Sequence, residues 1–326
     1  MHVGTNEKFA AFFLSRCKLR ADVPADAEVD RGIWVARTIA IDLGPWPEWL
    51  GTLTVDELQE PGLVLYATSP SRRPEVLDAE HDSLQRAVQD VFHGLTLHGV
   101  PSFNKGANIV GANVNGELRV RRYSNLQELR TASGLPPFVV GIAELQRAVT
   151  AGQRLREMQD ENVNSPVNAR WARLLRGVSV LLKANLAANE FGDRLHQFVR
   201  VLEALIKPRI QQSRRDFAHR AQTFVVANAP TARILDEMYD LRSHVEHVHA
   251  AMDALATGSR EERIATVNLR TRQADVLARV ALGRVIESDV LYETFSTDDR
   301  VDEFWRLRDD QRRQQWGERI DLRKIV

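Results

Sequence analysis

The sequence predicts a mixed α+β domain at the N-terminus, followed by an all-α bundle of four or five helices. The run from Ile33 to Ile41 is rich in β-branched residues, which favours a strand. Asn115-Gly116 separates residues 108–114 from 117–123, and this dipeptide is the strongest short-range hairpin signal in the chain. Strand signals nearly vanish after Pro166, where apolar residues recur at helical spacing. The chain is therefore expected to change fold class part-way along its length.

The α+β domain is assigned to residues 1–135. Its first 20 residues fit either a helix or a strand, because Phe9, Phe12 and Phe13 lie among polar residues without a clear period. Short strands are expected at 52–55 and 63–68. A helix is expected over Glu80 to Leu97, where the apolar residues form one stripe.

A connecting helix and linker are assigned to residues 136–165, after the break at Pro136-Pro137. The bundle is assigned to 166–290 and an accessory helix to 291–326, where Phe304, Trp305 and Trp316 lie among many charges. Ser259 and Glu262 have the spacing of a capping box at the start of the last long helix, and Ser213 with Asp216 forms a weaker one. The expected bundle helices cover 169–186, 191–206, a short segment from 213, a helix from about 234 to 252, and 259–285.

Composition limits the classes of function. Lys+Arg and Asp+Glu both number 44, so a protein that coats nucleic acid over a wide basic surface is excluded and any RNA contact should be local. Cys17 is the only cysteine, which gives no disulfide framework and no cysteine metal site. The apolar runs are too short for a membrane span, and the first residues lack the pattern of a signal peptide. We expect a protein of the reducing cytoplasm.

The segment from Tyr239 to His249 concentrates titratable chemistry, with one arginine, one serine, three histidines and two carboxylates. The guanidinium of Arg242 suits phosphate oxygens, and the imidazole of His247 can accept and return a proton near neutral pH. If the whole segment is helical, Ser243 lies one turn before His247, and Arg242 one turn before Glu246. This arrangement suggests phosphoryl chemistry on a nucleic acid or nucleotide.

The segment Arg242-Ser243-His244-Val245-Glu246-His247 resembles the motif of the HEPN superfamily of helical ribonucleases. Residues 193–198, 202–205 and 238–243 resemble the corresponding parts of its ApeA-like branch, and the likeness covers roughly 165–290. Two positions depart from the family pattern. Val248 stands where glycine is frequent, and His249 stands where the toxin branch carries a tyrosine that is modified.

The resemblance implies a metal-independent endoribonuclease that needs no cofactor and acts as an effector of a bacterial anti-phage defence or toxin-type system. It implies a homodimer in which two motif helices face each other across a two-fold interface, where the second copy doubles the catalytic groups. Arg242 would hold the phosphate, His247 would transfer protons, Ser243 would fill the family's polar position and Glu203 would orient groups around the cleft. The N-terminal domain would sense a protein or ligand trigger.

Other interpretations of the same residues stay open. Arg242 could simply pair with Glu246 on a solvated face, and the bundle could be a non-catalytic RNA-, nucleotide- or protein-binding module or a structural dimerisation domain. A metal site from Asp240, His244 and His247 is allowed by helical spacing, although the zinc-protease signature is absent. A local RNA-backbone track is predicted, with a solvated loop as the alternative, from Lys207, Arg209, Arg214, Arg215 and Arg220.

Overall fold

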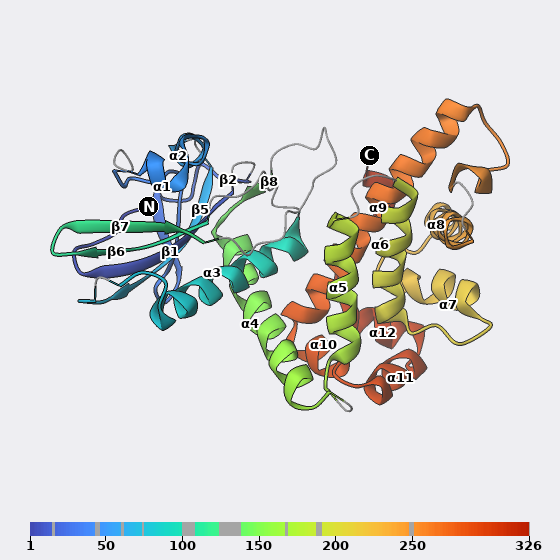
Figure 1. The fold of residues 1–326 in the computed structure, drawn as a ribbon. Helices are drawn as coiled ribbons and strands as arrows, with labels where there is room; N and C mark the ends of the chain where they lie inside the picture. The colour runs from blue at the N-terminus through green and yellow to red at the C-terminus, as the bar shows by residue number, and fades with distance from the viewer. Residues whose placement is uncertain are drawn as a thin grey trace. The chain divides into compact units, whose positions relative to one another are not determined.

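The computed structural model describes residues 1–14, 17–42, 46–59, 62–73, 75–99, 108–123, 138–166, 169–186, 191–247 and 251–325. The chain divides into two compact units, Met1–Arg156 and Glu157–Val326 (Figure 1). The first unit is rich in β-strands and the second is helical, which confirms the predicted change of fold class. The division falls inside the segment 136–165 that we assigned to the connection.

The first unit is built on one antiparallel sheet in the order β3-β4-β5-β1-β6-β7. Its central strand β1 is buried over almost its whole length, so it shows no polar–apolar alternation, which is why the sequence left residues 1–20 undecided. A separate pair joins β2 (Cys17–Leu19) and β8 (Phe138–Val140) in parallel. The strands of the main sheet are β1 (Glu7–Leu14), β3 (Asp26–Asp30), β4 (Ile33–Ala36), β5 (Leu63–Pro70), β6 (Asn108–Val114) and β7 (Glu117–Arg122).

The hairpin prediction is confirmed. Asn115 and Gly116 join β6 to β7 with φ values of 53° and 83°, respectively, so both central residues occupy the left-handed region that a type I′ turn requires. The strand predicted at 52–55 is wrong, because α2 (Thr52–Gln59) is a helix. Its Val55 and Leu58, three residues apart, are buried in the core cluster on one face of the sheet, next to α1 (Pro47–Leu50).

Helix α3 (Ala79–His98) packs on the sheet, and the helix predicted over 80–97 is confirmed. The ring of Phe92 meets that of Phe12 of β1 edge-on at 6.2 Å. Helix α4 (Ile142–Asn164) approaches α3 closely: a Cβ built at Gly94 would lie 1.9 Å from the carbonyl oxygen of Ala148. Only glycine allows this backbone contact within the first unit.

In the second unit α6 (Phe191–Ile206) is the central helix, since it packs on α5 (Ala172–Leu186), α8 (Ala229–Glu246) and α9 (Arg260–Glu287). Figure 1 shows α5, α6 and α9 side by side, whereas α8 is seen end-on and therefore crosses this group. The apolar stripe predicted for α6 is buried, including Phe198 and Leu202. The unit is helical as predicted, but α8 does not continue an antiparallel bundle.

Two helix starts test the capping predictions. The capping box of Ser259 and Glu262 is confirmed at the start of α9. The weaker one is wrong, because Gln212 stands at the N-cap of α7 (Ser213–Arg220) and Asp216 accepts hydrogen bonds from Arg209 instead. A guanidinium offers a carboxylate two parallel donors, and this bond is stronger than a single backbone cap.

The tail forms three helices rather than one, α10 (Asp289–Thr294), α11 (Asp298–Arg306) and α12 (Asp309–Trp316). Its aromatic side chains are buried in the helical unit of the same chain, where the rings of Trp316 and Phe224 lie 4.3 Å apart. The indole of Trp305 donates a 3.1 Å hydrogen bond to the carbonyl of Leu205 in α6. Among the described residues, no helix is long and apolar enough to cross a membrane.

Candidate functional site

The motif lies at the C-terminal end of α8. The helix starts where the Asn228 side chain accepts from the backbone N–H of Thr231, at 2.9 Å, and it buries one stripe that includes Met238 and Leu241. We expected this helix to run to about residue 252, but it ends at Glu246. A short 3-10 turn, η2 (Ala251–Ala254), follows, while Val248 and His249 lie outside the described residues.

Arg242 is held by two carboxylates. Its Nη2 lies 3.1 Å from Oε2 of Glu203 on α6, and its Nη1 pairs with Glu246 one turn along α8. The guanidinium also lies over the ring of Tyr239, 5.6 Å from the centroid. The Arg242 side chain is only 13 % exposed and Glu203 is 16 % exposed, whereas Glu246 is 46 % exposed. Glu203 is therefore shielded from solvent, whereas the more exposed Glu246 can be displaced from Arg242 by an incoming anion.

Burial raises the pKa of Glu203, although the charge and the hydrogen bond of Arg242 act in the opposite direction. The sequence resemblance gave Glu203 the task of orienting groups, and the structure brings it into direct contact with Arg242. The two residues are 39 positions apart, so this contact depends on the crossing of α6 and α8.

His247 stands at the C-cap of α8, with an exposed side chain. Its backbone N–H bonds to the carbonyls of Ser243 and His244, at 3.3 and 3.2 Å. The bond to Ser243 spans one helical turn, so His247 still follows Ser243 by one turn at the end of the helix. Among the described residues, no side-chain hydrogen bond joins Ser243 to His247, so the orientation of His247 by Ser243 stays a prediction.

His196 of α6 is a neighbour of Arg242 that we did not single out from the sequence. Burial is the main cause that lowers the pKa of the His196 imidazole, and the charge of Arg242 acts in the same direction. The sequence held one signal for it: His196 and Glu203 are seven residues apart, which places them on one face of α6. The residues that meet here are thus Arg242, Glu203, Glu246 and His196, with His247 at the end of the same helix.

The predicted basic track is mostly engaged in intramolecular contacts. Lys207 Nζ binds the carbonyl of Asp298 and, at 2.7 Å, the carboxylate of Asp302. Arg209 binds Asp216 and Arg214 binds Asp240, at 2.7 and 2.8 Å.

Arg220 completes the engaged set, since its Nη1 donates to the carbonyls of Ile206 and Lys207 at 2.8 Å. Arg215 is exposed, and no contact of its side chain is found among the described residues. The five side chains therefore do not form a continuous row of available cations, and an RNA contact through most of them requires that an existing ion pair be replaced.

The side chains of the alternative metal site, Asp240, His244 and His247, are not arranged as metal ligands. Asp240 pairs with Arg214, and Nδ1 of His244 lies 3.1 Å from the backbone carbonyl of Asp240. Within the described ranges, no group of three or more His, Cys, Asp or Glu side chains is placed to hold a metal ion.

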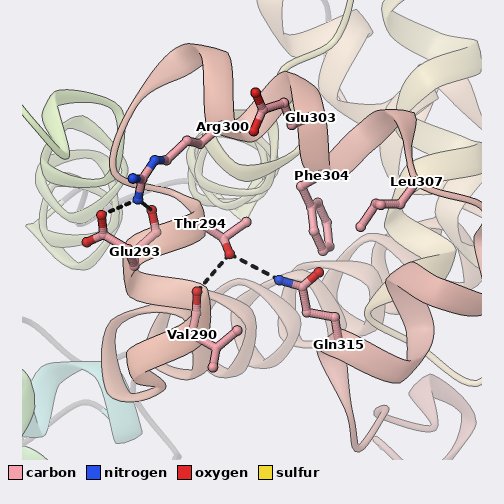
Figure 2. Close-up of a pocket in the computed structure, with 8 residues that line it drawn as sticks. All are labelled: Val290, Glu293, Thr294, Arg300, Glu303, Phe304, Leu307 and Gln315. Carbon is pink, nitrogen blue, oxygen red and sulfur yellow. Dashed lines mark hydrogen bonds and ion pairs between the residues drawn. The ribbon is translucent and has the colours of Figure 1, made fainter.

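A separate pocket of about 560 Å³ lies between α10, α11 and α12 (Figure 2). Phe304 and Leu307 give it an apolar side, while Gln315 donates to the hydroxyl of Thr294 at 3.0 Å. Its only lining arginine, Arg300, is paired with Glu293. None of the motif residues lines this pocket. The remaining lining residues are Val290 and Glu303.

Comparisons of the chain with protein-family models, with curated proteins and with solved structures found no match.

Proposed function

We propose that the chain is a metal-independent endoribonuclease whose site is centred on Arg242 and His247. The observation that carries this proposal is the ion pair of Arg242 with Glu203, which holds a guanidinium at the α6–α8 crossing on the helix that ends at the exposed His247. Guanidinium groups stabilise the charge that develops on a phosphate in the transition state, and imidazoles transfer protons near neutral pH. A phosphate would replace Glu246, the more exposed of the two carboxylates.

The proposal includes a homodimer, in which a second copy of the motif helix brings further groups to the same cleft. It also places the protein among the effectors of bacterial anti-phage defence or toxin-type systems, with the first unit as the sensor of a trigger. The dimer and the defence role rest on the resemblance to the HEPN superfamily. The site residues support only the proposed RNA cleavage reaction.

The test is cleavage of RNA in the presence of EDTA. We expect Arg242→Ala and His247→Ala each to lower the rate by about 100-fold or more, since single acid–base and charge-stabilising groups contribute at least that much. Matched controls are Arg308→Ala and His219→Ala, which remove exposed side chains of the same unit. Equal rates in wild type, the two site variants and the two controls would contradict the endoribonuclease assignment. An active enzyme that is strictly monomeric would contradict the proposed homodimer.

A second candidate is a non-catalytic helical module that binds RNA, a nucleotide or a protein. The observation that favours it is the neutralisation of Arg242 by two carboxylates, which is also how a purely structural arginine is held. Measurable RNA binding with no cleavage under any condition would support this candidate over the nuclease.

A further inference from the structure

The pocket between α10, α11 and α12 is lined by one face of each of two helices. From α11 and its C-cap it takes residues spaced as i, i+3, i+4 and i+7, and from α10 residues spaced as i, i+3 and i+4. Figure 2 shows the α11 side chains facing Thr294 of α10 and Gln315 of α12. A volume of about 560 Å³ is that of a site for a small molecule. The lining groups that remain unpaired therefore indicate which ligand the pocket fits.

Arg300 brings unused hydrogen-bond donors to the pocket. Its Nη1 donates to the backbone carbonyl of Glu293 at 3.1 Å and to the Glu293 carboxylate. A guanidinium has five N–H groups, and those on Nε and Nη2 of Arg300 have no partner among the described residues. Glu293 also accepts from Nη2 of Arg170 at 2.6 Å, so one carboxylate serves two guanidinium groups. One positive charge at this end of the pocket is therefore not neutralised.

Glu303 brings the opposite charge. Its side chain is exposed and has no ion pair or hydrogen bond within the described ranges, although Arg300 is only three positions away on α11. Residues with this spacing on a helix have Cβ atoms about 5–6 Å apart. The pocket thus presents a guanidinium edge and a carboxylate close together and unpaired with each other, and a small ligand with both signs of charge complements them.

The rest of the lining is apolar apart from one hydroxyl and one amide. The apolar side chains are those of Phe304, Leu307 and Val290. The hydroxyl of Thr294 donates to the carbonyl of Val290 at 2.7 Å and accepts from Nε2 of Gln315 at 3.0 Å. This second bond turns the amide nitrogen of Gln315 towards Thr294 and leaves its carbonyl oxygen as an acceptor. An apolar wall therefore lies beside the two charged groups.

We propose that this pocket binds a free α-amino acid with a large apolar side chain. The carboxylate of the ligand accepts from Nε and Nη2 of Arg300, and its ammonium group donates to the carboxylate of Glu303. Its side chain packs against Phe304 and Leu307. A simple amine leaves the guanidinium edge without an acceptor, and a simple carboxylic acid places its charge near Glu303 with no compensating donor. The inference is independent of the proposed RNA cleavage, since none of the motif residues lines the pocket.

The test is isothermal calorimetry on the full chain at pH 7, with L-phenylalanine and L-leucine as probes. We expect at least one of the two to bind with a Kd below about 1 mM, as contacts of this kind allow for a ligand of this size. Phenethylamine lacks the carboxylate of L-phenylalanine, and 3-phenylpropionate lacks its ammonium group. Each analogue should bind about tenfold or more weakly than L-phenylalanine, because each loses a hydrogen bond between charged groups.

The decisive variant is Glu303→Gln, which removes the carboxylate from an exposed side chain without an existing contact. It should weaken L-phenylalanine about tenfold or more and leave the affinity for 3-phenylpropionate unchanged or tighter. Asp299→Asn is the matched control, because it removes the same charge one turn earlier on α11, outside the pocket, and it should bind as wild type does. Arg300 also holds Glu293, so its contact is tested by phenethylamine on the wild-type protein rather than by a variant.

Four results would overturn the inference. The first is a wild-type Kd above about 1 mM for both amino acids. The second is an analogue that binds as tightly as L-phenylalanine, which shows that one of the two charged contacts is not made. The others are wild-type affinity in Glu303→Gln and an equal loss of affinity in Asp299→Asn. None of these results bears on RNA cleavage, so the two proposals fail separately.

Discussion

Asp216 anchors Arg209, and its replacement by asparagine gives a quantitative test of this part of the structure. The carboxylate accepts three hydrogen bonds from Arg209, from the backbone N–H, Nε and Nη2, at 2.7–2.9 Å. These bonds lower the pKa of Asp216 from 3.8 to about 2. A difference of nearly two pKa units corresponds to about 2 kcal/mol of folding free energy. The Asp216 side chain is 5 % exposed but that of Arg209 is 58 % exposed, so solvent screens the pair from one side and about 2 kcal/mol is an upper bound.

The sign of the pH dependence follows from the lowered pKa. The folded protein holds the Asp216 proton less tightly than the unfolded chain, so the stabilisation is complete above pH 3.8 and is lost as the pH falls towards 2. Asp216→Asn should lower the free energy of unfolding by about 1–2 kcal/mol at neutral pH, and its difference from wild type should shrink between pH 4 and pH 2.

The assay is urea unfolding of the full chain followed by far-UV circular dichroism, at a series of pH values. Asp310→Asn is the matched control, because the ion pair of Asp310 with Arg308 is exposed and should contribute less than about 1 kcal/mol. A loss below about 0.5 kcal/mol for Asp216→Asn, or a loss that stays constant down to pH 2, would refute the reasoning.

Three further predictions concern the core and the site. Gly94→Ala should destabilise the chain by about 2 kcal/mol or more in urea unfolding because its Cβ would strike the facing backbone, whereas Gly177→Ala, with 3.4 Å to its nearest neighbour, should be neutral or stabilising. Phe198→Ala should cost about 3–5 kcal/mol in the same assay, because this side chain of α6 is fully buried. Glu246→Ala should tighten phosphate binding a few-fold in calorimetry, since it removes the exposed competitor from Arg242, and weaker binding would contradict the proposed anion site.

Much of the secondary structure follows from local patterns. The Asn115-Gly116 hairpin and the Ser259–Glu262 capping box were both predicted, since each depends on residues within a few positions of one another. The prediction failed where local preference was overruled by packing. Residues 52–55 form part of a helix, because in a helix Val55 and Leu58 lie on the same face and are both buried in the core.

The site was predicted less completely than the fold. Arg242, His247 and Glu203 were chosen from the sequence, and the contact between Arg242 and Glu203 was not, because a 39-residue separation carries no periodic signal. We expected α8 to continue to about residue 252, and its end at Glu246 places His247 at the C-cap. His196 lies close enough to Arg242 for that charge to lower its pKa, and this proximity exists only in the folded helical unit.

The sequence by itself determined the change from a β-rich to a helical unit and the placement of Arg242 on a helix of that unit, because hydrophobic periodicity and turn chemistry act over short stretches of chain. Only the tertiary structure decided which charges are neutralised. Arg209 and Arg242 look alike as basic residues, and each is held by a carboxylate that the folding of the helical unit brings to it. Ion-pair partners are selected by distance in space, which the crossing of helices sets and local sequence does not.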